Sequence, residues 1–91
     1  MEELKKARTV AARRVTVRRN RITALTLDRK NEASVEEEME RYHQDFEHYR
    51  LKHESLLEVI EDDDIMDHED ELYTKQEAKT LEFVRSIEDW L

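Results

Sequence analysis

The chain has 91 residues, enough for one domain, and 44% of them are charged while 37% are hydrophobic. It has no glycine, proline or cysteine, which excludes disulfides, thiol nucleophiles, cysteine-ligated zinc and glycine-rich nucleotide-binding loops. No apolar run approaches the roughly 20 residues that cross a bilayer, so we expect no membrane partner. The lack of cysteine fits a reducing compartment. We therefore expect a single helical domain over residues 1–91 that is intracellular, in the cytoplasm.

Charge divides the chain into a basic first third and an acidic remainder. Residues 1–30 hold ten Lys/Arg and three Asp/Glu, a net charge of +7, while residues 31–91 hold six and twenty-one, a net charge of −15. A basic segment of this kind is typical of nucleic-acid or anionic-membrane binding. The interpretation we favour is that the basic segment packs beside the acidic ones and is neutralised there.

A first helix is predicted over residues 2–30, because apolar residues recur there at helical spacing. The main stripe consists of Leu4, Ala7, Ala11, Val15, Ile22 and Leu25. A weaker second stripe of Val10, Val17 and Ala24 would let this helix contact a second neighbour.

A second helix is predicted over residues 35–62 and carries the clearest pattern. Ser34 followed by Glu37 forms a capping box that would start it. Apolar positions then alternate spacings of four and three for nearly four heptads, which is the seam of a coiled coil. The members of this heptad are Val35, Met39, Tyr42, Phe46, Tyr49, His53, Leu56 and Ile60.

A third helix is predicted over residues 67–90, with Asp64 or Asp67 as its N-cap. Short connections between helices of similar length favour antiparallel neighbours. The predicted fold class is therefore all-α, an elongated antiparallel three-helix bundle or coiled coil. We expect its interaction seam to comprise Val35, Met39, Tyr42, Phe46, Tyr49, Leu56, Ile60, Phe83, Ile87 and Trp90.

Two polar residues interrupt the apolar stripes. Arg18 lies within the first stripe, so it should pair with an acid of a neighbouring helix, such as Glu47, Glu54 or Glu58. His53 lies within the heptad, where a hydrogen-bonded core residue or a register-fixing residue is the expected role.

Neither a metal site nor a catalytic site is expected. The histidines at positions 43, 48 and 53 are five residues apart and cannot share one helix face, whereas helical metal ligands need spacings of three or four. The acidic run Asp62–Glu71 lacks the glycine and ligand order of an EF-hand. No nucleophile, base and oxyanion-binding group can be assembled, so we predict a non-enzymatic protein without cofactors.

The order of features resembles the N-terminal helical segment of Gag-like polyproteins from Bel/Pao-type LTR retrotransposons. The resemblance covers nearly the whole chain: a basic opening helix with Arg13-Arg14 and Arg18-Arg19, an acidic middle helix, and a close on Glu88-Asp89-Trp90-Leu91. It implies a structural role in which copies self-associate into particles. The zinc knuckles and aspartic protease motif of such polyproteins are absent from this sequence.

Three hypotheses about function follow. The leading one is a structural module acting in protein–protein assembly, with itself (as a homo-oligomer, for example a dimer that swaps its first helix) or another helical protein as partner. The second is nucleic-acid binding, and the residues that would contact phosphates are Arg13, Arg14, Arg18, Arg19 and Arg21. A designed helical protein is the third, but the Val/Thr-rich first helix, the arginine within its apolar stripe and the histidine within the heptad argue against it.

Overall fold

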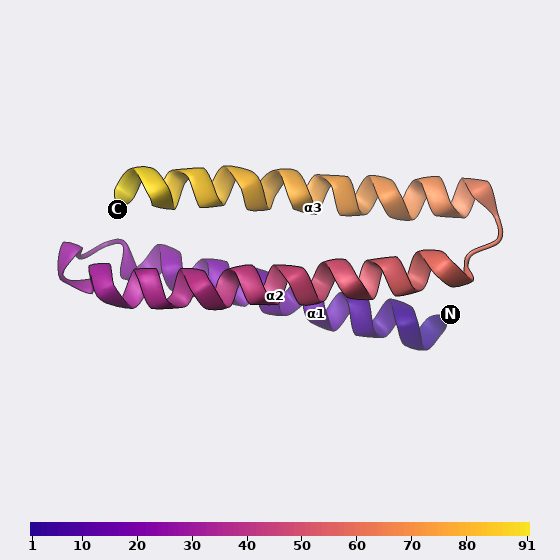
Figure 1. Ribbon diagram of the computed structural model, residues 1–91, viewed down its shortest axis with the longest axis horizontal. Helices are drawn as coiled ribbons and strands as arrows, with labels where there is room; N and C mark the ends of the chain where they lie inside the picture. The colour runs from indigo at the N-terminus through magenta and orange to yellow at the C-terminus, as the bar shows by residue number, and fades with distance from the viewer.

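The computed structural model describes residues 1–91 and contains three long helices, α1 (Glu2–Leu25), α2 (Glu32–Val59) and α3 (Asp63–Trp90), with a short 3-10 helix, η1 (Arg29–Asn31), before α2. The helices run up, down and up along a molecule of 50 × 20 × 15 Å. The N-terminus and the α2–α3 connection lie at one end, and η1 and the C-terminus lie at the other (Figure 1). The predicted all-α, elongated antiparallel arrangement of three helices is confirmed.

The first turn differs from the prediction at both of its helix ends. Helix α1 stops at Leu25, five residues early, because the Asp28 carboxylate accepts the Lys30 N–H and starts η1. The Asn31 side chain then donates to the Leu25 carbonyl and satisfies the end of α1. Ser34 is not the N-cap of the second helix: η1 leads directly into α2, so Ser34 already lies inside its first turn.

The second turn is also displaced relative to the prediction. Helix α2 ends at Val59 rather than residue 62, since Ile60 adopts an extended conformation. The Asp62 carboxylate accepts the N–H groups of Asp64 and Ile65, so Asp62 is the N-cap of α3, and the predicted caps Asp64 and Asp67 lie within the helix. The first acid after the extended residue has taken the capping role.

The core lies between the three helices and follows the predicted stripes. Every member of the α2 heptad is buried except Phe46, which is partly buried. Helices α1 and α2 run close together along their length, whereas the α3 backbone stands farther from α2 (Figure 1). The buried apolar residues are Ala11, Val15, Ile22, Val35, Met39, Tyr42, Tyr49, Leu56, Ile60 and Ile87.

Candidate interaction surface

Arg18 is held between α1 and α2 by two carboxylates. Its Nε lies 2.5 Å from Asp45 Oδ2 and its Nη1 lies 2.7 Å from Glu38 Oε2. The prediction that Arg18 pairs with an acid of the next helix is correct, but none of the predicted partners is right. Arg18 faces the first half of α2, so Glu54 and Glu58 lie too far along the helix. Glu47 lies on the outward face of α2, where it pairs with Arg50.

Glu38 is buried and gathers several cations. Arg41 Nη1 lies 3.0 Å from its Oε1, and Arg21 Nη1 lies 3.9 Å from its Oε2. The hydrogen bond from Arg18 is the main cause that lowers the pKa of Glu38, and it outweighs the opposing effect of burial. Glu38 is therefore a carboxylate in the folded protein at neutral pH.

A second buried carboxylate joins α1 to α3. Glu69 lies 2.5 Å from Arg8 Nη2 and 3.7 Å from Lys5 Nζ. Burial raises the pKa of Glu69, but the close ion pair with Arg8 and the charge of Lys5 outweigh it and hold the pKa below its ordinary value. Lys5 and Arg8 of α1 are therefore paired with an acid of the same chain.

His53 is a hydrogen-bonded core residue, as predicted. Its ring is buried and stacks on Tyr73, with centroids 4.5 Å apart. Nε2 lies 2.9 Å from Asp70 Oδ1, and Nδ1 lies 3.4 Å from Arg8 Nη1. Because a guanidinium can only donate, this contact assigns Nδ1 as the acceptor and Nε2–H as the donor to Asp70.

Two further arginines contact aromatic rings. Arg19 Nε donates to the Tyr42 hydroxyl at 3.1 Å, and its guanidinium lies 5.9 Å from the ring centroids of both Tyr42 and Phe83. Arg29 lies 4.7 Å from the Trp90 ring centroid and donates to the Trp90 carbonyl. Of the arginines predicted to contact nucleic acid, Arg18 and Arg19 are thus engaged inside the protein.

The remaining basic residues flank an exposed apolar row on α1. No carboxylate forms an ion pair with Arg13 or Arg14, and Arg21 has only the long contact to Glu38. Between them Val10 is 45% and Val17 is 54% exposed. We call these five residues the α1 outer face.

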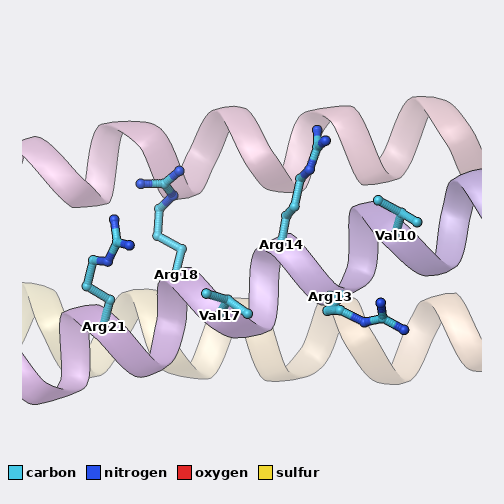
Figure 2. Close-up of a pocket in the computed structure, with 6 residues that line it drawn as sticks. All are labelled: Val10, Arg13, Arg14, Val17, Arg18 and Arg21. Atoms are coloured by element: carbon cyan, nitrogen blue, oxygen red, sulfur yellow. The ribbon is translucent and has the colours of Figure 1, made fainter.

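Figure 2 shows how the α1 outer face is laid out. Val17 lies between the arginines and Val10 at one end of the row, while Arg14 and Arg21 are directed towards α2 and Arg13 lies on the α3 side. Together with Arg18, these residues line a shallow hollow of about 230 Å³. The second stripe predicted on this helix is therefore present, but within the chain no neighbouring helix covers it.

The predicted interaction seam lies inside the molecule. Its residues are buried, apart from Phe46, Phe83 and Trp90, which are partly buried. They hold the three helices of one chain together, so the folding role of the seam is visible in the structure. Self-association through the seam stays a prediction.

Sequence reasoning missed the buried acids Glu38 and Glu69 and the partly buried Asp45. One signal was available: Glu38 directly precedes the heptad residue Met39, and Glu69 lies four residues before Tyr73, so each borders an apolar stripe. A carboxylate at such a position needs a cation from another helix, and the basic first helix supplies it.

None of the helices is both long and apolar enough to cross a membrane. In comparisons with known proteins, no family model matches the chain, and no curated protein or solved structure is significantly similar to it. The similarity to Gag-like segments therefore stays a prediction, and the surface itself carries the functional argument.

Proposed function

We propose that the protein is a non-enzymatic, self-associating helical module whose copies contact one another through the α1 outer face. The observation that carries this proposal is the exposed row of Val10 and Val17 with the unpaired Arg13 and Arg14 beside it. Apolar residues along a helix, bordered by charges that have no partner in the chain, are typical of a surface that receives another helix. The resemblance to Gag-like segments points the same way, since it implies assembly of copies, and an intracellular setting belongs to the same proposal.

Nucleic-acid binding is the second candidate, because Arg13, Arg14 and Arg21 are exposed on one face. Only these few cations are accessible there, since Arg18 and Arg19 are engaged internally. The chain carries a net charge of −8, so its acidic helices would repel phosphates. Affinity for nucleic acid grows with the number of phosphates that are contacted. Because the exposed basic row offers only three arginines, a protein partner is favoured.

Light scattering after size exclusion, over a series of protein concentrations, tests the proposal. A single helix pair buries less than the roughly 1,200–2,000 Å² of a stable complex, so we expect a mass that rises with concentration and falls with salt. The variant Val10→Glu/Val17→Glu should remain monomeric. Leu81→Glu is the control, because Leu81 is 55% exposed and lies on α3. This variant should associate like the natural chain.

Circular dichroism and melting temperature must show that the variants fold, and we expect this because exposed substitutions change stability by about 0.5 kcal/mol or less. A natural chain that is monomeric at every concentration would contradict the proposal. If that monomer shifted RNA in a salt-sensitive mobility assay, the nucleic-acid function would replace it.

A further inference from the structure

We infer that the α1 outer face of one copy docks antiparallel on the outward face of α2 of a second copy, with Val10 against Leu51 and with Arg14 and Arg21 paired to Glu47 and Glu40. This inference rests on the proposed function and names the surface that completes it. Both faces are exposed, and the opposite sides of the same helices are buried in the bundle.

The outward face of α2 has the complementary chemistry. At 100° per residue, its acids at positions 36, 40, 47, 54 and 58 point away from the bundle, and all are exposed. Leu51, in their midst, is 48% exposed. Arg50 forms ion pairs with Glu47 and Glu54 within the chain, so Arg14 of a second copy would add a second cation to Glu47, while Glu40 has no ion pair in the chain. The outward face of α3 fits less well, since Lys75 and Arg85 interrupt its acids.

The spacing of the two faces determines the orientation. Val10, Arg14, Val17 and Arg21 follow steps of four, three and four, and so do the α2 positions 40, 44, 47 and 51. Antiparallel alignment places Val10 against Leu51, Val17 against the uncharged Gln44, and both arginines against glutamates. Parallel alignment instead places Val10 and Val17 against glutamates. Antiparallel docking is therefore the arrangement that satisfies both charge and apolar contact.

The same offset operates inside the chain, where it relates Arg8 to His53 and Arg19 to Tyr42. Docked copies would thus lie side by side without an axial shift. The contact joins two different faces, so each pair leaves one α1 outer face and one α2 outward face for further copies. Masses above two chains are expected at high concentration unless a ring closes.

Charge exchange tests the inference directly. Arg14→Glu/Arg21→Glu reverses the α1 outer face, and Glu40→Arg/Glu47→Arg reverses α2. Because like charges would then oppose each other, each double variant alone should raise the dissociation constant at least about tenfold. The four substitutions combined in one chain should restore it to within about threefold of the natural value, and the two double variants should bind each other when mixed.

Glu82→Arg/Glu88→Arg on α3 is the control, because both residues are exposed and the net charge changes as in the α2 variant. It should associate like the natural chain, and circular dichroism should show that all variants fold. If reversal of α2 leaves association unchanged, or the combined variant is as weak as each half, the inference is wrong. Self-association that Val10→Glu/Val17→Glu still abolishes would then leave the proposed function standing, whereas a natural chain that never associates would overturn both.

Discussion

The two interfaces that build the bundle use different side chains. Between α1 and α2, small and β-branched residues such as Ala11 and Val15 are buried, and the backbones run close together. Helix α3 is held farther away by aromatic rings, with Tyr73 stacked on His53 and Phe83 lying 5.0 Å from Tyr42 between ring centroids. The distance between helices thus follows the size of the side chains at each interface.

The two interfaces also differ in how many ion pairs support each buried carboxylate. Between α1 and α2, Arg18 has two acids, and Glu38 has further cations within 4 Å. At α3, Glu69 depends chiefly on Arg8. The first interface has redundant ion pairs and close packing, and the second depends on fewer and larger contacts, so we expect α3 to be the more easily detached helix.

The largest effect should come from Tyr42, which belongs to both interfaces. Its ring is fully buried, and its hydroxyl accepts from Arg19 and donates to Thr80 Oγ1 at 3.4 Å. Tyr42→Ala should lower the free energy of unfolding by about 3–5 kcal/mol through the cavity it leaves. Urea unfolding measures this loss. Tyr42→Phe, which keeps the ring, should cost about 1 kcal/mol, and equal losses in the two variants would contradict the assignment of Tyr42 to the core.

The two ion-pair networks provide a sharper comparison. Arg8→Ala leaves the buried Glu69 with only the 3.7 Å contact to Lys5, and it should cost about 2–3 kcal/mol in unfolding free energy. Arg18→Ala leaves Glu38 with Arg41 at 3.0 Å and leaves the partly buried Asp45 without an ion pair, and about 1 kcal/mol is expected. If Arg18→Ala cost more than Arg8→Ala, the α3 interface would not be the one whose buried carboxylate has fewer alternative cations.

Acid should weaken the protein through the same carboxylates. Folding lowers the pKa values of Glu38 and Glu69 below the 4.5 of an ordinary glutamate. Their stabilising contribution is therefore complete above about pH 4.5, and it is lost as the pH falls towards the folded values, because the unfolded chain then binds more protons. Melting temperatures between about pH 7 and pH 3 should fall accordingly. Glu69→Gln should lower the melting temperature at neutral pH and make the acid decline shallower; an unchanged decline would exclude Glu69 as a contributor.

The smallest effect concerns the end of the bundle, where Arg29 lies over Trp90. Arg29→Ala removes an exposed cation–π contact and should cost about 0.5 kcal/mol. The tryptophan emission should shift to the red as the last turn of α3 frays. Lys30→Ala is a suitable control, since the Lys30 side chain forms no ion pair, and the same shift in both variants would show that the contact with Arg29 is not responsible.

The number and direction of the helices and the buried face of α2 could be predicted from the sequence, because a heptad repeat with eight core positions leaves little choice of face. It could not place the turns, where Asp28 and Asp62 compete with other capping residues such as Ser34 and Asp64. Small differences between local hydrogen bonds decide among such caps. The position of the α1–α2 connection sets which residues of the two helices lie opposite each other. Misplacing this connection therefore also gave the wrong partners for Arg18.

The candidate surface was predicted only in part. The spacing predicts the stripe of Val10 and Val17, but periodicity does not tell whether a third helix of the same chain covers it. The answer depends on where α3 packs, and Arg8 and Arg19 draw α3 to the other side of α1 through Glu69 and Phe83.

A dilution series of backbone amide NMR spectra on the natural chain tests self-association through the α1 outer face most directly. We predict that the concentration-dependent chemical-shift changes concentrate at Val10, Val17 and neighbouring arginines on α1, and at Glu40, Glu47 and Leu51 on α2. Spectra that do not change with concentration, or changes confined to the exposed side of α3, would contradict the claim that the α1 outer face joins copies of this protein.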